Sequence, residues 1–314
     1  MPPDIVGLGM ACLDLIIRTH NLPSWESGAQ LTAMAIEGGG PVATALAAAA
    51  RLGADCSFIG TYGSDRMGAI KMQTLVEYNV DVSHAVRRPG PENQAILVCV
   101  HAATGERVFS GTGGYRSDLL KPEELDRDYI TSARCLHLDG FHISAALAAA
   151  EWMRAAGKLV MLDGSATRGP ISAEMRRLVE LCDVLICGSG FGPALTGCSD
   201  LWQAGEQILK LGPRIVVQTE GADGSYTVTR EERFHTPAFQ VSVVDTTGAG
   251  DVFHGAFLVG LLRGWDVRSI CLFSTAVSAI KCTRLGGRAG IPTFSEALAF
   301  LAERGIELPT PIRS

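Results

Sequence analysis

The segment DTTGAGDVFHGAF, from Asp245 to Phe257, joins two apolar runs through a turn of small residues. The preceding VSVV has the composition of a strand, and DVFHGAFLVGLLRG after the turn has the spacing of a helix. The first amides of a helix have no partner within the helix and, together with its dipole, attract anions. Gly248, Ala249 and Gly250 therefore form a candidate anion-binding turn, because such small residues let a phosphate approach the backbone.

Asp251 follows this turn directly, and its carboxylate would repel a phosphate. One interpretation is that Asp251 caps the helix. The other is that it accepts the proton of a hydroxyl group that attacks a phosphate, because phosphoryl transfer uses a base in that position. The residues of this segment favour the second interpretation only modestly.

Short apolar strands alternate with helices after Tyr115. The pattern runs through RCLHLDG, SAALAAAEWMRAAG, KLVMLDG, ISAEMRRLVELC, DVLICG, LWQAGEQILKLG and RIVVQTEG. It predicts an α/β fold with a mostly parallel sheet and helices on both faces. Asp139, Asp163 and Glu220 each follow one of these strands, and ligands of such sheets bind beyond the carboxyl ends of the strands.

Residues 11–37 and 81–112 have a different texture, with β-like runs, the second set divided by Pro-Gly and Thr-Gly turns. We expect these two segments to form a small β-sheet lid over an α/β domain made of residues 1–10, 38–80 and 113–314. Glycines at the borders, Gly38 and Gly113–Gly114, are candidate hinges. Bare strand edges invite association, so a homodimer formed through the lid is expected.

Composition excludes several classes of protein. The 314 residues carry a formal net charge of −6 and no basic cluster larger than a pair, which argues against nucleic acid and membrane partners. The first residues lack the pattern of a signal peptide, and no apolar run is long enough to span a membrane. Nine cysteines without a Cys-x-x-Cys pair are typical of buried thiols in a reducing compartment, so a cytoplasmic location is expected.

DTTGAGDVFHGAF resembles the C-terminal signature of the ribokinase family, also called the PfkB carbohydrate kinases. GGGPVATALAAAARLGA (38–54) resembles the N-terminal signature of that family, and VVQTEGADGSYTV (216–228) its nucleotide segment. KCTRLGGRAGIP (281–292) is similar to the segment that closes the adenine pocket. The resemblance covers nearly the whole chain and implies a ribokinase-like fold and ATP-dependent phosphorylation of a sugar hydroxyl. Within the family, the sequences of these motifs resemble those of the sulfofructose kinase-like branch most closely.

The resemblance also implies roles for single residues. Asp251 falls on the general base, and the amides of Gly248, Ala249 and Gly250 fall on the anion hole. The implied substrate-binding residues are Asp14, Gly39, Gly40 and Thr44. The implied ATP-binding residues are Thr219, Gly221 and Gly224. The implied site for a monovalent cation such as K⁺ consists of Asp245 and Thr247. Mg²⁺ is expected to accompany ATP.

The chain departs from the family pattern in several places. Thr44 stands where many relatives carry asparagine, and GSGF (188–191) stands where an Asn-x-x-Glu pattern usually assists Mg²⁺. Sulfofructose kinases have an arginine where this chain has Phe141–His142, and hexose-phosphate kinases often have a basic residue where it has Pro41. Both differences favour an uncharged sugar or polyol. An anionic sugar remains the alternative, because Arg107, Arg116 or Arg168 could reach it.

Two further hypotheses remain. A nucleoside kinase would need an aromatic partner for the base in the lid. A catalytically weak protein that senses sugars or nucleotides would explain the missing Asn-x-x-Glu groups, although Asp251 argues against it. Formation of ADP with a panel of sugars, compared with binding without turnover, would separate these hypotheses.

Overall fold

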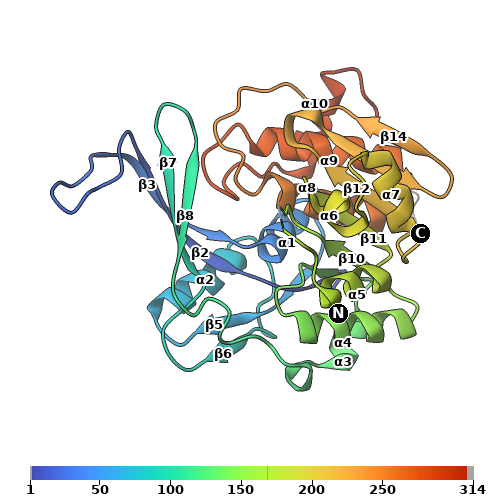
Figure 1. Ribbon diagram of the computed structural model, residues 1–314, viewed down its shortest axis with the longest axis horizontal. Coiled ribbons are helices and arrows are strands. Elements are labelled where there is room, and N and C mark those ends of the chain that lie inside the picture. Colours follow the sequence, from blue (N-terminus) through green and yellow to red (C-terminus); the bar gives the residue numbers. More distant parts are fainter. Residues whose placement is uncertain (1, 168, 310–314) are drawn as a thin grey trace.

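The computed structural model describes residues 2–167 and 169–309. Its main body is built on an eight-stranded sheet in the order β14-β13-β12-β11-β10-β9-β1-β4 (Figure 1). The parallel strands are β1 (Ile5–Leu8), β4 (Cys56–Ile59), β9 (Cys135–Leu138), β10 (Leu159–Asp163), β11 (Val184–Gly188) and β12 (Ile215–Thr219). Two antiparallel strands, β13 (Ser225–Thr229) and β14 (Arg233–Thr236), complete one edge.

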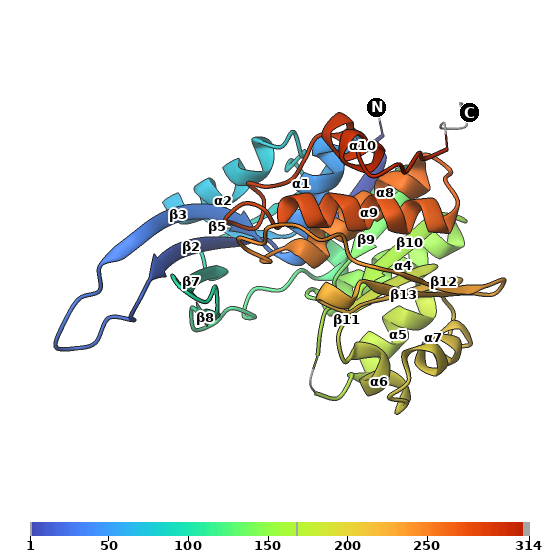
Figure 2. The same ribbon diagram turned by 90° about the horizontal axis from the view of Figure 1, so that it is seen from above.

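Helices cover both faces of this sheet (Figure 2). One face carries α1 (Pro41–Arg51), α2 (Arg66–Val76), α8 (Ala249–Leu262), α9 (Val267–Lys281) and α10 (Phe294–Ala302). The other carries α3 (Arg127–Ser132), α4 (Ile143–Ala155), α5 (Ala173–Leu181), α6 (Phe191–Thr196) and α7 (Leu201–Leu209). Each face has its own core because successive strand residues point to opposite sides: Val6 and Leu8 pack in one core and Ile5 in the other.

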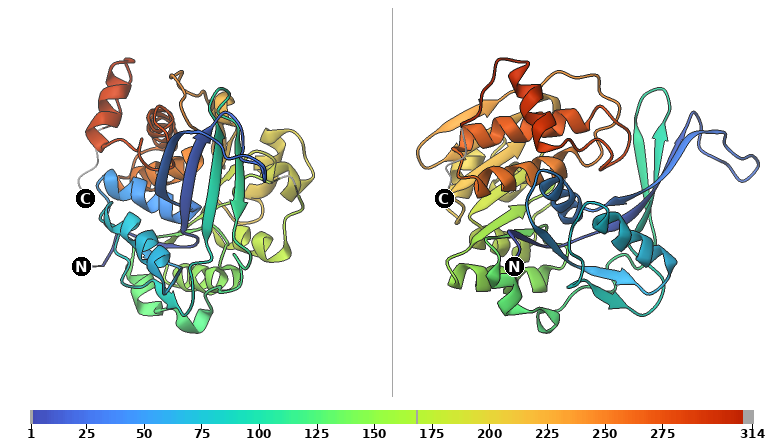
Figure 3. Two further views of the ribbon diagram at one scale, coloured as in Figure 1. Left: turned by 90° about the vertical axis from the view of Figure 1, so that its left-hand side faces the viewer. Right: turned by 180° about the vertical axis from the view of Figure 1, so that it is seen from behind.

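A second, four-stranded sheet projects from one side of the main body and faces the viewer in the left view of Figure 3. We call it the small sheet; its order is β3 (Leu31–Gly39), β2 (Cys12–Thr19), β7 (Ala95–His101) and β8 (Arg107–Gly111). The β7–β8 pair is an antiparallel hairpin around HAATGER. The predicted α/β fold, with helices on both faces of a mostly parallel sheet and a small separate sheet, is confirmed.

Two expected strands behave differently in the structure. Val86–Arg88 forms β6, which pairs with β5 (Thr61–Gly63) and not with the small sheet. The segment VSVV (241–244) is not a strand. Val243 and Val244 are exposed, and the amides of Val244 and Asp245 both donate to one carbonyl oxygen, that of Cys282, so no ladder forms.

Two short 3₁₀ helices, η1 (Pro122–Glu124) and η2 (Gly221–Asp223), lie in connections. Within residues 2–167 and 169–309, no helix is both long enough and apolar enough to cross a membrane.

Candidate active site

The turn into α8 lies at the carboxyl edge of the large sheet. The His254 ring, one turn into the helix, donates to the Gly250 carbonyl (2.7 Å) and faces the Ile186 carbonyl of β11 (3.3 Å). Gly248 adopts a φ of 72°, in the left-handed region, so a side chain at this position would strain the turn. The Ala249 amide donates to the Thr246 carbonyl (3.2 Å). For the amides of Gly248 and Gly250, the described part of the chain provides no acceptor.

Asp251 is the third residue of α8 and is half-buried. Its carboxylate accepts no hydrogen bond from the residues that the structure describes, so it does not cap the helix through a side-chain bond. Burial raises the pKa of Asp251 well above its usual range, and the nearby carboxylates of Asp163 and Asp139 raise it further, against the opposing effect of His254 and Arg288. A free carboxylate with a raised pKa has the properties of a general base.

Asp14, on β2, meets Gly39 at the end of β3. The Cys12 thiol donates to the Asp14 carboxylate (3.2 Å), and a Cβ added at Gly39 would overlap that carboxylate. Gly40 has a φ of 93°, and a Cβ there would lie 2.5 Å from the Met10 carbonyl oxygen. Gly39 is therefore required by close packing against Asp14, and Gly40 by its positive φ and its close approach to the Met10–Ala11 backbone. Burial raises the pKa of Asp14, although the Cys12 hydrogen bond and Arg288 oppose this.

Arg288 links three segments around Asp14 through hydrogen bonds, a role that the sequence did not predict. Its buried guanidinium donates to the Thr44 hydroxyl (3.2 Å), the Thr74 hydroxyl (3.2 Å) and the Gly39 carbonyl (2.8 Å). The threonine at position 44 thus has a partner of its own in this chain, since its hydroxyl accepts the Arg288 bond. The charge of Arg288 also lies close enough to Asp14 and Asp251 to oppose the rise that burial causes in the pKa of both.

A cavity of about 320 Å³ adjoins the turn. The expected ATP-binding residues Thr219, Gly221 and Gly224 line it together with Ala249 and Gly250. Its remaining wall is largely apolar, with Val241, Val243, Phe253, Ala279 and Cys282. The structure therefore brings the expected nucleotide residues and the candidate anion hole to one cavity, with walls suited to a purine base.

Glu220 and Asp163 are the acidic groups that fit Mg²⁺ beside this cavity. The Ser189 hydroxyl donates to the Glu220 carboxylate (2.6 Å), so the GSGF segment holds an acid from the neighbouring strand although it lacks one of its own. Asp163, at the end of β10, lies 3.7 Å from the His254 ring. Among residues 2–167 and 169–309, no group of three or more candidate ligands surrounds a metal position. Mg²⁺ that is bound mainly by phosphates needs only one or two carboxylates.

The residues present do not fit a monovalent cation at Asp245 and Thr247. The Asp245 carboxylate accepts the Thr247 amide and hydroxyl (both 2.8 Å) and the Gly286 amide (2.9 Å). Its backbone carbonyl accepts the Lys281 ammonium (3.0 Å). A bound cation needs oxygen atoms directed toward it, and here these oxygen atoms are directed toward N–H and O–H donors.

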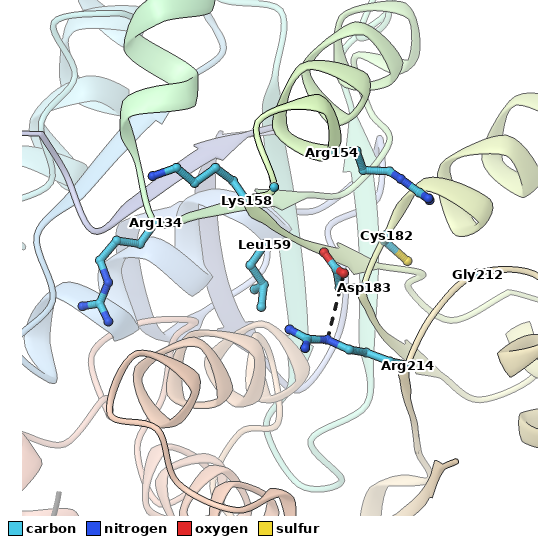
Figure 4. Close-up of a pocket in the computed structure, with 9 residues that line it drawn as sticks. Arg134, Arg154, Lys158, Leu159, Cys182, Asp183, Gly212 and Arg214 are labelled. Carbon is cyan, nitrogen blue, oxygen red and sulfur yellow. Dashed lines mark ion pairs between the residues drawn. The ribbon is translucent and has the colours of Figure 1, made fainter. Parts of the chain in front are cut away.

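A larger cavity, of about 560 Å³, lies at the opposite edge of the sheet, where β10, β11 and β12 begin. Four of its lining residues are basic: Arg134, Arg154, Lys158 and Arg214. Figure 4 shows that the charged ends of Lys158 and Arg154 point away from one another, and that Arg214 approaches Asp183 (4.0 Å). Because the charges do not converge, this cavity does not form an anion site, and the candidate active site is the one around Asp251.

Comparisons with known proteins show which family and fold the chain resembles. A family model described as pfkB family carbohydrate kinase matches residues 3–294. The 5-dehydro-2-deoxygluconokinase of Shouchella clausii is 28% identical over 319 residues, which cover 96% of this chain and 97% of the relative. The ATP-dependent ribose-1-phosphate kinase of Halopiger xanaduensis is 29% identical over 300 residues, covering 96% and 98%. The crystal structure of ribokinase from Thermotoga maritima superposes with a TM-score of 0.82 at 26% identity, covering 96% and 99%.

Proposed function

We propose, from the premise that the chain belongs to the pfkB family of carbohydrate kinases, that it transfers the terminal phosphoryl group of ATP to a hydroxyl of an uncharged sugar. The activity class, ATP-dependent sugar kinase, follows from the family and from its relatives. The observation that carries the mechanism is the position of Asp251, which directly follows Gly250 of the cavity wall and lies near Arg288, whose charge also acts on Asp14.

In this mechanism, Asp14 and the Gly39–Gly40 pair position the sugar, and Asp251 accepts the proton of the hydroxyl that attacks. The amides of Gly248 and Gly250, which are unpaired within the described part of the chain, donate to the phosphoryl group as its charge develops, and the Ala249 amide joins them if its bond to Thr246 gives way. Mg²⁺ carried by ATP neutralises phosphate charge, and Glu220 and Asp163 would hold its waters. Potassium is not part of this proposal, because Asp245 is already occupied by donors.

The preference for an uncharged sugar rests on the cations around the pocket. Three donor groups of Arg288 are engaged by Thr44, Thr74 and Gly39. His142 is buried, its Nδ1 accepts the Leu120 amide (3.1 Å), and burial lowers its pKa to about 3, so it is neutral. Arg107 pairs with Asp245 (3.4 Å), and Arg116 lies over the Phe141 ring (5.1 Å). Arg168 lies outside the described residues.

A panel of acceptors tests this function. With ATP and Mg²⁺, we expect ADP to form with at least one neutral sugar or polyol, and much more slowly with the corresponding phosphosugars and sulfosugars. Among the described residues, Arg288 and Arg107 are already paired, His142 is neutral and Arg116 lies over the Phe141 ring, so an extra anion would lack a ready partner. Nucleosides belong in the panel as the rival acceptors. Binding of a sugar without ADP formation would support the sensing hypothesis, and turnover only with sulfofructose would contradict the uncharged substrate.

We also propose that the small sheet is a lid and that two copies of it pair. The register places Leu15, Met34, Ile36 and Val108 on one face of the sheet, all exposed, while Asp14 and Arg107 lie on the face toward the active site. The outer sides of the edge strands β3 and β8 have no paired strand within the described chain. An exposed apolar face between open edges is suited to a second copy of the same sheet.

The dimer is tested by a charge placed on that face. The wild-type protein is expected to have the mass of a dimer in light scattering at micromolar concentration, and Ile36→Glu that of a monomer, because a buried unpaired carboxylate opposes association. Val76→Glu is the matched control, since Val76 is a similarly exposed apolar residue that belongs to α2 and not to the exposed face of the small sheet. A monomeric wild-type protein would contradict the proposal.

A further inference from the structure

Asp245 begins the turn that carries the candidate anion hole, and its carboxylate lies among donors. Three bonds come from its own loop and from the Gly286 amide, as described above. A fourth contact comes from the small sheet, where Arg107 places its guanidinium 3.4 Å from Oδ1. These bonds lower the pKa of Asp245 in spite of its burial, so the carboxylate is ionised. The loop thus contains a fixed negative charge, one residue before Thr246 and three before Gly248.

Lys281 places a positive charge beside the same loop. It is the last residue of α9 and is completely buried, and its ammonium donates to the Asp245 carbonyl (3.0 Å). Such a buried ammonium needs both oxygen partners and a counter-ion. Asp245 meets both needs: burial lowers the pKa of Lys281, but the Asp245 carbonyl accepts the hydrogen bond and its nearby carboxylate opposes that lowering.

An ammonium group and a potassium ion carry the same charge and are held by the same kind of oxygen atoms. A potassium ion at Asp245 would therefore meet the positive charges of Lys281 and Arg107 around a single carboxylate. Like charges at such distances repel, and more strongly in a buried site than in water. The position next to the anion hole is thus already occupied by a cation that is part of the chain.

We propose that the Lys281 ammonium is the resident monovalent cation of the anion-hole loop, and that it makes the enzyme independent of potassium. The ammonium fixes the Asp245 carbonyl, and this bond sets the start of the turn from which the amides of Gly248 and Gly250 project. Lys281 is therefore a positioning residue, acting through Asp245. The proposal rests on the kinase function proposed above.

The first test uses the wild-type protein. Its rate of ADP formation and its thermal midpoint are expected to stay the same when K⁺ is replaced by tetraethylammonium, which has no hydroxyl group, at constant ionic strength. The thermal midpoint needs no sugar, so it remains informative if no acceptor in the panel is phosphorylated. A rate or a midpoint that rises with K⁺ overturns the proposal, whether or not any variant folds.

The second test removes the ammonium in two ways. Lys281→Ala leaves a space in which an added cation can bind, and Lys281→Met fills that space with an uncharged chain of similar length. Both variants are expected to lose kcat by roughly 10- to 100-fold, less than the 10²–10³-fold cost of deleting an anion-hole donor, with little change in the KM for sugar. K⁺ or NH₄⁺ should restore the rate and raise the midpoint of Lys281→Ala but not of Lys281→Met.

Lys71→Ala is the matched control, because Lys71 is also a buried lysine that donates to a carbonyl oxygen, that of Thr61 (2.9 Å), and pairs with Glu92 (2.7 Å). Any loss in this variant should not respond to K⁺. A folded Lys281→Ala protein whose rate and midpoint ignore K⁺ and NH₄⁺, or one that is as active as wild type without them, overturns the proposal.

Discussion

Replacing Asp251 with asparagine should lower kcat by roughly 10²–10⁴-fold, which is the usual contribution of a general base, while the protein remains folded. Asparagine keeps the shape of the side chain but cannot take the proton of the sugar hydroxyl. The affinity for ATP should hold or increase, because a negative charge beside the phosphates is removed. Stability should not fall, since Asp251 lies near the carboxylates of Asp163 and Asp139 and makes no hydrogen bond within the described chain.

The matched control is Asp266→Asn, the same chemical change at the start of α9. There the side chain is a true N-cap, accepting the Ser269 amide (3.0 Å), and asparagine is also a good cap, so stability and activity should stay near wild type. ADP formation and thermal unfolding of both variants give the comparison. A well-folded Asp251→Asn protein with near-normal turnover would rule out the base and, with it, the mechanism.

The pH profile provides a second readout of the same residue. A base acts when it is deprotonated, and the pKa of Asp251 is raised, so kcat should fall with decreasing pH at a higher pH than an ordinary carboxylate would give. The folded protein holds this proton more tightly than the unfolded chain does. The same ionisation therefore lowers the free energy of unfolding as the pH rises from the usual carboxyl pKa to the raised one. Asp251→Asn should abolish both dependences.

The sequence was informative where function depends on local pattern. The alternation of strands and helices predicted the parallel sheet, and the acids that follow three of its strands, Asp139, Asp163 and Glu220, lie at its carboxyl edge as expected. The glycines at 248–250 predicted the start of α8. In each case neighbouring residues determine the local backbone. The carboxyl ends of parallel strands then meet at one edge of the sheet, which brings these acids together.

The sequence was uninformative where distant segments meet. Arg288 contacts Thr44 and Gly39 across more than 240 residues, and Lys281 reaches Asp245 from the C-terminal end of α9, two helices further along the chain. No periodicity marks such pairs, because each depends on the packing of whole elements. The loss of Asn-x-x-Glu at 188–191 suggested a weakened Mg²⁺ site, yet the Ser189 hydroxyl holds Glu220 from the adjacent strand. Similarly, the apolar composition of VSVV predicted a strand, but a strand also needs a neighbour to pair with.

Replacing Gly250 with alanine should separate stability from activity. Gly250 is the second residue of α8, and a Cβ added there meets no atom within 4 Å. Alanine is a better helix former and restricts the unfolded chain, so the free energy of unfolding should rise by about 0.4–1 kcal/mol. Gly250 also lines the nucleotide cavity, and the added methyl group would occupy space that a phosphate needs to reach the backbone amide. The rate of transfer should fall by roughly 10²-fold, at the lower end of the cost of losing an anion-hole donor.

Gly248→Ala shows why position 250 is the more decisive one. At 248 the backbone is left-handed, and a Cβ would lie 2.8 Å from the Gly287 carbonyl oxygen, so alanine should lower both stability and activity. A loss of turnover in that variant would not distinguish a distorted loop from a missing donor. In Gly250→Ala the two effects have opposite signs, and thermal unfolding measured beside the kcat and KM for ATP reports both. If Gly250→Ala is stabilised and fully active, phosphate does not approach this amide, and the turn serves only to start the helix.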